Sequence, residues 1–215
     1  MQKSVPKPIP YHLMEQIREG IITGKYPPGS SLREQGLEKE FGCSRGPIRE
    51  ALRLLQHRGL VTHEPRRGFR VLSLTATNIR QLYNLRAVLE SHAVEGLEGH
   101  ISEALLDELN AANAAMRRHL KARQIKEYLQ SNLVFHALIL RHAPNPILER
   151  TINSINELGE PLRHAMLRNR TLSTRAVDEH DELVALLRKN AIADAVGLMK
   201  RHIIGSISTA LGALE

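Results

Sequence analysis

The stretch Ser44-Arg45-Gly46-Pro47-Ile48-Arg49-Glu50-Ala51-Leu52-Arg53 predicts a short helix with two distinct faces. Apolar residues recur at intervals of three and four, as on a helix face that packs against a core: Ile48, Ala51, Leu52 and Leu55. The boundaries of the helix are also visible in the sequence. Ser44 is a favourable N-cap, Pro47 falls in the first turn, where its missing N–H is not needed, and Gly59 ends the helix.

The other face of this helix is basic, because Arg45, Arg49 and Arg53 follow one another at intervals of four residues. Arginines on a short, capped helix suit the major groove of DNA, where they pair with guanine or with phosphates. On the spacing alone, a charged face exposed to solvent is an equally good interpretation. The neighbouring segments decide between the two.

The distribution of charge indicates two different modules. The chain has 215 residues and a hydrophobic fraction of 42%, enough for one large domain or two modest ones. Residues 1–72 contain 13 Lys and Arg against 7 Asp and Glu, whereas residues 73–215 contain 17 against 16. The net charge of +7 therefore lies almost entirely in the first third, which indicates a polyanion-binding module joined to a neutral one. A basic helix on a membrane surface is the competing idea, but the first helix lacks that amphipathic pattern.

The sequence also limits the compartment and the partners. A single cysteine, Cys43, excludes an internal disulfide framework. There is no apolar run of about 18 residues for a membrane span and no secretion signal at the start. We therefore expect a cytoplasmic protein without a membrane partner.

Two shorter segments precede the basic helix. Residues 9–23 carry a helical apolar stripe that ends at Gly24. Ser31 and Glu34 have the spacing of a capping box, with Ser31 as the N-cap of a second helix that Gly42 closes. Two short helices joined by a tight turn, the second of them basic, predict a helix-turn-helix.

The segment that follows predicts a β-hairpin with a basic tip. Residues 60–64 and 69–72 have strand character, and Pro65-Arg66-Arg67-Gly68 lies between them. Such a hairpin is the wing of a winged helix, and its arginines fit the negative potential of a narrow minor groove. A solvated hairpin tip is the alternative.

Residues 10–72 resemble the winged-helix DNA-binding domain of the GntR family of bacterial transcription regulators. The matching features are Pro28-Gly29, Leu32-Arg33-Glu34, Phe41-Gly42, Ser44-Arg45 with Pro47, Arg49-Glu50-Ala51-Leu52, Gly59-Leu60-Val61 and Gly68. Two departures, Glu38 for the usual alanine and Gly46 for a frequent threonine, remove no basic residue. The resemblance implies DNA contacts from Arg33, Ser44, Arg45, Arg49, Arg66, Arg67 and Gly68.

The remaining two thirds of the chain predict only helices, and no strand pattern is present. The expected helices cover residues 76–98, 102–121, 124–142, 145–168, 175–189 and 191–213. Such a run should fold as an antiparallel bundle. The expected fold is therefore mainly α, with a winged helix-turn-helix over residues 9–72 and an all-helical effector-binding and dimerisation domain over residues 75–214.

Three histidines fall on inward-facing helical stripes of this second part: His136, His180 and His202. Asn132 precedes His136 by one helical turn, so both lie on one patch. Neutral imidazoles that converge in a bundle suit zinc, nickel or a similar divalent cation. Ordinary core histidines are the alternative, because the sequence does not show that the three helices meet.

The helical part resembles the FCD ligand-binding domain that follows the wing in one GntR subfamily. The matches are Leu82-Tyr83-Asn84-Leu85-Arg86 with Glu90, Phe135-His136, Asn145-Pro146, His180 and His202. The resemblance implies a divalent metal, most simply zinc, on Asn132, His136, His180 and His202, although the family usually has aspartate in the place of Asn132. It also implies that Arg86 holds the carboxylate of an effector, whereas a structural bridge from Arg86 to Glu90 is the alternative.

These expectations combine into a ligand-responsive repressor that is not an enzyme. A homodimer would present two basic helices to a pseudo-palindromic DNA operator, and a small carboxylate bound over the metal would alter operator affinity. A helical metal-dependent phosphohydrolase fused to a DNA-binding domain is the alternative. It is disfavoured because Asp181 points about 100° away from His180 around the helix, and no carboxylate is in helical register with the histidines. A DNA binder without an effector leaves the second domain unexplained.

Overall fold

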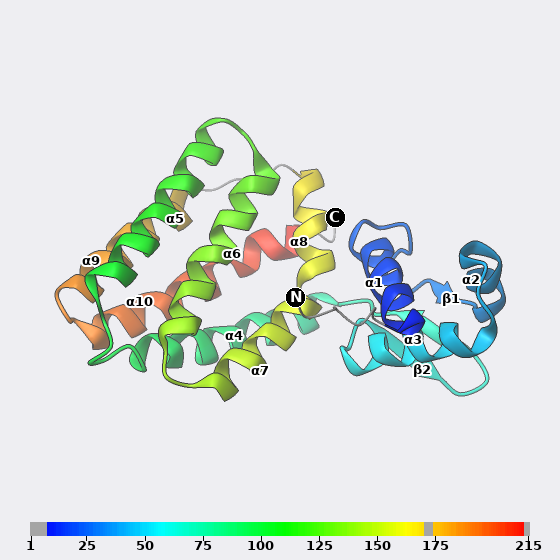
Figure 1. Ribbon diagram of the computed structural model, residues 1–215. Helices are drawn as coiled ribbons and strands as arrows, with labels where there is room; N and C mark the ends of the chain where they lie inside the picture. The colour runs from blue at the N-terminus through cyan, green and yellow to red at the C-terminus, as the bar shows by residue number, and fades with distance from the viewer. Residues whose placement is uncertain (1–7, 170–173, 213–215) are drawn as a thin grey trace, which may run out of the picture. The chain divides into compact units, whose positions relative to one another are not determined.

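The computed structural model describes residues 8–169 and 174–212 (Figure 1). The chain divides into two compact units, one formed by the residues up to Thr75 together with Glu157–His164, and the other by the rest. Parts of two sequence expectations lie outside the described residues, namely residues 170–173 of the predicted break between helices and the last residues of the second domain.

Up to Thr75, the first unit contains three helices and a small sheet among its described residues. Its elements in chain order are α1 (Ile9–Ile22), β1 (Ser31–Leu32), α2 (Glu34–Phe41), α3 (Arg45–His57), β2 (Val61–Glu64) and β3 (Gly68–Val71). The strands are antiparallel in the order β1-β3-β2, with Ser31 opposite Arg70 and Glu64 opposite Gly68. The predicted helix-turn-helix and wing are confirmed.

The apolar face of α3 forms the centre of this unit. Its residues Ile48, Ala51, Leu52 and Leu55 are all completely buried. They join Leu13, Met14 and Ile17 of α1 and the inner side chains of the sheet in one core cluster. Burying a side chain of leucine or isoleucine size stabilises a fold by about 1.5–3 kcal/mol, so this face fixes α3 and leaves its arginines outside.

The predicted capping box at the start of α2 is wrong. Ser31 pairs with Arg70 in the sheet, and this pairing keeps the backbone extended through Leu32. The helix therefore begins at Glu34, with Arg33 in the N-cap position and no side-chain capping bond. Glu34 is the first helical residue rather than the third, and its carboxylate is free to make other contacts.

The other helix boundaries of this unit agree with the sequence, with one qualification. Gly42 ends α2 in the left-handed conformation at φ 62°, which glycine adopts without steric cost. Ser44 occupies the N-cap position of α3, but its side chain makes no capping hydrogen bond.

Within the residues that the structure describes, the rest of the chain contains helices and no strands. They are α4 (Ala76–Glu95), α5 (Glu103–Lys121), α6 (Ile125–His142), α7 (Pro146–Leu158), α8 (Glu160–Asn169), α9 (Thr174–Arg188), α10 (Ile192–Gly205) and α11 (Ile207–Leu211). The main packing partners are α4 with α10, α5 with α6 and α9, and α9 with α10. The mainly α fold is confirmed, and no described helix is long and apolar enough to cross a membrane.

Two predicted helices are each divided in the structure. The helix expected over residues 145–168 is interrupted at Gly159, where Pro161 lacks the N–H that would bond the preceding turn. The helix expected over residues 191–213 is interrupted at Ser206, directly after Gly205, whose helix propensity is low.

Candidate functional site

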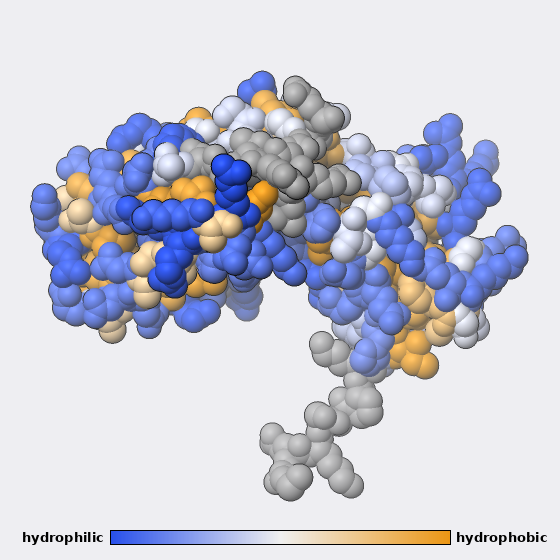
Figure 2. Space-filling model, turned by 90° about the horizontal axis from the view of Figure 1, so that it is seen from above, coloured by the Kyte–Doolittle hydropathy of each residue, from blue (hydrophilic) through white to orange (hydrophobic). Residues whose placement is uncertain are grey.

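A basic groove lies between α2, α3 and the wing. It has a volume of about 460 Å³, and its lining includes five arginines, Arg33, Arg45, Arg49, Arg66 and Arg67. The side chains of Arg45 and Arg49 are 67% and 47% exposed. Hydrophilic side chains project from the end of this unit where α2 and the wing lie (Figure 2). Exposed arginines around a groove are suited to bind phosphates and base edges.

The tip of the wing holds its arginines on a constrained backbone. Arg66 has φ 65°, in the left-handed region, and Gly68 follows at φ 81°. A side chain in that region costs about 1–2 kcal/mol, so the hairpin pairing between Glu64 and Gly68 must enforce it. Arg67 also lies 3.5 Å from a carboxylate oxygen of Glu64. The wing therefore presents Arg66 and Arg67 in a defined place.

Glu34 contacts two of the arginines that the sequence assigns to DNA. Its carboxylate accepts a hydrogen bond from Nε of Arg45, and it accepts bonds from Nε and Nη2 of Arg49 at 2.8 and 3.2 Å. The hydrogen bond from Arg49 is the main cause that lowers the pKa of Glu34, so the carboxylate is ionised at neutral pH. This contact has no signal in the sequence, where Glu34 stands at the third position of a capping-box pattern.

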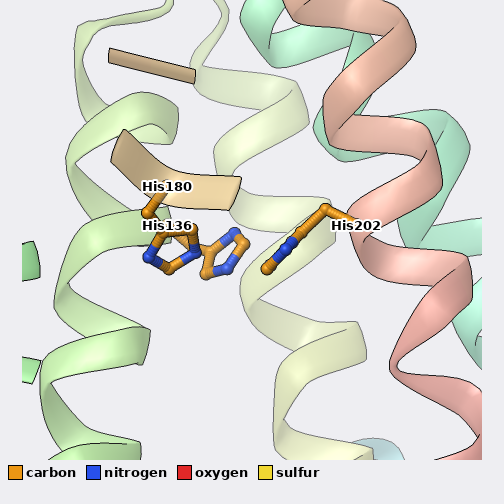
Figure 3. A group of neighbouring side chains, drawn as sticks. All are labelled: His136, His180 and His202. Carbon is orange, nitrogen blue, oxygen red and sulfur yellow. The ribbon is translucent and has the colours of Figure 1, made fainter. Parts of the chain in front are cut away.

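The second unit brings the three predicted histidines together. His136 comes from α6, His180 from α9 and His202 from α10, and their rings face one another (Figure 3). The ring centroids are 4.8–5.3 Å apart, and one candidate ligand nitrogen from each ring lies within 4.8 Å of the others. All three side chains are buried. We call these three residues the histidine centre.

His180 is the most constrained member of the histidine centre. Its ring stacks on Phe135 with the centroids 3.8 Å apart and the planes at 3°. Neither of its ring nitrogens has a hydrogen-bond partner among the described residues. Burial lowers the pKa of His180 well below its ordinary value, and His136 and His202 add to this effect. The imidazole is therefore neutral, which is the form that binds a metal.

Two carboxylates approach the outer nitrogens of the other histidines. Nδ1 of His136 lies 2.7 Å from Glu90, and Nδ1 of His202 lies 2.7 Å from Glu179. The opposite nitrogen, Nε2, of each ring is left for a ligand, as in many carboxylate–histidine–metal arrangements. Burial lowers the pKa of His202 even though the contact with Glu179 opposes this.

The sequence analysis named Glu90 only as a partner of Arg86 and did not name Glu179. Neither contact with a histidine could be predicted, because each carboxylate lies on a different helix from the histidine that it approaches. The sequence analysis did place Asp181 correctly outside the centre. The side chain of Asp181 accepts a hydrogen bond from Asn113 at 2.6 Å and pairs with Arg117.

Arg86 forms a salt bridge with Glu90, which was the structural alternative to effector binding in the sequence analysis. Its Nε and Nη2 lie 3.0 and 2.8 Å from Oε1 of Glu90. Burial opposes ionisation of Glu90, but Arg86 and then His136 lower its pKa to about 2. A chain of contacts thus runs from Arg86 through Glu90 to His136. Asn132 lies one turn before His136 on α6 and is half-buried.

The histidine centre fits a divalent metal. Zinc binds imidazole nitrogen at about 2.0–2.1 Å, so nitrogens within 4.8 Å of one another need only small ring rotations to close on one ion. Buried polar atoms are normally hydrogen-bonded, and the two orphaned nitrogens of His180 therefore call for a partner. His136, His180 and His202 could hold the ion.

A winged helix-turn-helix with a basic groove, followed by a helical domain with a buried histidine centre, defines a class of DNA-binding transcription regulators. Residues 11–71 match the model of the bacterial regulatory proteins of the gntR family, and residues 81–205 match the model of the FCD domain. The chain therefore belongs to the GntR family, in the group with an FCD domain, and is a DNA-binding transcriptional regulator.

Curated relatives and solved structures agree with this assignment. The HTH-type transcriptional regulator YdhC of Bacillus subtilis is 36% identical over 71% of this chain and 69% of its own length. The gluconate operon transcriptional repressor of Bacillus subtilis is 26% identical over 80% of this chain and 73% of its own. The structure of McbR from Escherichia coli has a TM-score of 0.77 at 17% identity, covers 98% and 100% of the two chains, and so shows the shared fold. The two curated relatives are named as regulators, which does not favour the phosphohydrolase alternative.

Proposed function

We propose that the protein is a repressor whose affinity for its operator changes when a small carboxylate binds over a divalent metal in the FCD domain. The functional form would be a homodimer, which presents two copies of α3 and of the wing to a pseudo-palindromic site. The metal would be zinc, with nickel as the next candidate. Its ligands would be Asn132, His136, His180 and His202.

The observation that carries this proposal is the histidine centre. Three buried imidazoles from three helices converge, and the nitrogens of one of them have no partner among the described residues. Imidazole nitrogens are favourable ligands for zinc and nickel. A bound divalent ion would attract an anion, and small carboxylates are anions of the right size and charge for a buried site.

The DNA contacts would come from the groove of the first unit. Arg45 and Arg49 on α3 would enter the major groove, with Ser44 at the start of the helix. Arg66, Arg67 and Gly68 would place the wing in the minor groove. Arg33 would contact the phosphates beside them.

Arg86 provides a physical link between the effector and the rest of the protein. It pairs with Glu90, which in turn touches His136. A carboxylate bound at the metal would compete with Glu90 for Arg86 and change the packing of α4. Because α4 begins at Ala76, directly after β3 and the short link of residues 72–75, such a change is passed along the chain to the DNA-binding unit.

The test is the effect of acids on DNA binding. The operator probe is a duplex selected by the wild-type protein from a random library, and fluorescence anisotropy follows its binding to zinc-loaded protein across a panel of small carboxylic acids. We expect at least one acid to change the wild-type Kd by about 5–150-fold.

The matched variants are His136→Ala and His142→Ala. His142 lies on the same helix, and its ring bonds the carbonyl of Leu138 outside the histidine centre. His136→Ala should keep its operator affinity without acid and lose the response, whereas His142→Ala should retain both. A response of equal size in His136→Ala, or no response to any acid in the zinc-loaded wild type, would contradict the proposal.

A further inference from the structure

Glu34 occupies a singular place in the basic groove. Among the described residues that line the groove, it is the only carboxylate beside five arginines. Its side chain is 14% exposed, whereas those of Arg45 and Arg49 are far more open. A carboxylate in a surface that binds a polyanion weakens that binding. Its presence in the groove therefore calls for a separate role.

The contacts of Glu34 hold one edge of each guanidinium. Arg45 donates its Nε to Glu34, and Arg49 donates both Nε and Nη2. Nη1 and Nη2 of Arg45 and Nη1 of Arg49 take no part in these hydrogen bonds, and bidentate pairing with guanine requires two N–H groups of one guanidinium. One carboxylate therefore fixes two side chains that would otherwise lose much rotamer freedom on binding.

The backbone of α2 keeps Glu34 in place. Glu34 is the first residue of α2, where the helix dipole favours a negative charge. The preceding strand β1 is anchored to β3 through the pairing of Ser31 with Arg70 and of Leu32 with Phe69. The sheet and the helix thus fix the backbone position from which the carboxylate of Glu34 reaches both arginines.

We propose that Glu34 is a positioning residue that determines DNA specificity, because it orients Arg45 and Arg49 toward bases and withholds their charge from phosphates of unrelated sequences. The inference rests on the proposed DNA contacts of these two arginines. Without the carboxylate, both guanidinium groups are free to follow any phosphate. Binding to random DNA then becomes tighter and more dependent on salt, and the advantage of the operator shrinks.

The experiment compares two duplexes with the full-length protein. One is the duplex selected by the wild type from a random library, and the other is a scrambled duplex of equal composition. The variant is Glu34→Gln, which keeps the size of the side chain and removes its charge. The matched control is Glu38→Gln, which makes the same charge change one turn further along α2, where the structure describes no ion pair for Glu38.

For Glu34→Gln we expect the ratio of operator to scrambled affinity to fall by about tenfold or more. Affinity for the scrambled duplex should rise, and its logarithmic salt dependence should steepen by about 0.9 for each additional phosphate contact. Glu38→Gln should leave the ratio as in the wild type. A rise in affinity for the scrambled duplex together with a lower ratio separates a positioning role from a structural one, because a folding defect lowers both affinities.

An unchanged ratio in Glu34→Gln, or a parallel fall of both affinities, would overturn the inference. Arg49→Ala separates that failure from failure of the proposed contacts. If Arg49→Ala loses operator binding while Glu34→Gln keeps the wild-type ratio, only the role of Glu34 is refuted. If Arg49→Ala binds the operator as the wild type does, the contacts on which the inference rests are refuted with it.

Discussion

Replacing His180 by leucine should make the metal-free protein more stable, although His180 lies in the core. The ring is 1% exposed, and neither nitrogen has a partner among the described residues. Leaving a buried polar group unsatisfied costs about 1–3 kcal/mol. The variant also loses the stack on Phe135, which is worth about 0.5–1.5 kcal/mol. The net expectation for His180→Leu without metal is a gain of about 1 kcal/mol, or a Tm higher by about 2–4 °C.

Zinc should make the wild type more stable than His180→Leu. At a free concentration one hundred times its Kd, a ligand that binds only the folded state stabilises it by about 2.7 kcal/mol. The wild type gains this term and His180→Leu does not, so the wild type becomes the more stable protein when zinc is present. Calorimetric melting of the full chain, first with a chelator and then with excess zinc, gives the Tm of both proteins under each condition.

Phe135→Leu is the matched control, because it removes the stack and leaves the nitrogens of His180 in place. It should be less stable than the wild type in the chelator and should still respond to zinc. The reasoning is refuted if His180→Leu melts below the wild type in the chelator, because the orphaned nitrogens then carry no penalty. It is also refuted if zinc raises the Tm of His180→Leu as much as that of the wild type.

Three further predictions concern pH, the fourth metal ligand and the first unit. Burial lowers the pKa of two histidines in the folded chain, His180 and His202. As the pH falls, the unfolded chain takes up protons at these histidines before the folded chain does. With a chelator present, the free energy of unfolding should be constant above about pH 6.5 and should decrease at lower pH by up to about 1.4 kcal/mol per pH unit for each histidine. Urea midpoints that stay the same between pH 7.5 and 5.5 would contradict this. Asn132→Asp should tighten zinc binding by at least about tenfold in a chelator competition, and an equal affinity would mean that this position does not bind the metal. Gly20→Ala should destabilise by about 1–2 kcal/mol in urea, since its Cβ would lie 2.4 Å from the ring of Tyr26 and overpacking outweighs the gain in helix propensity. Gly36→Ala, with open space around its Cβ, should be neutral or stabilising, and equal effects of the two changes would refute the steric explanation.

The first unit could be predicted well because its signals are local. The apolar stripe of α3, the glycine after α2 and the basic turn of the wing each lie within a few residues of the feature they specify. The start of α2 could not be predicted in this way. Pairing of Ser31 with Arg70 joins residues far apart in the chain, and this pairing overrides a local capping pattern.

The histidine centre shows the same limit in the second unit. Helical periodicity placed each histidine on an inner face, and the resemblance to the FCD domain indicated that they meet. Periodicity cannot show which inner faces converge, nor that Glu90 of α4 reaches a histidine of α6. The division between α7 and α8, in contrast, follows from Pro161, which is a local signal that the sequence shows directly.

The metal content of untagged protein tests the central claim most directly, with the wild type measured beside His136→Ala. We expect about one zinc or nickel ion per chain in the wild type, because three buried imidazoles lie close together, and loss of that ion in the variant. No metal in either protein, or the same content in both, would contradict it and would leave the buried histidines as packing residues.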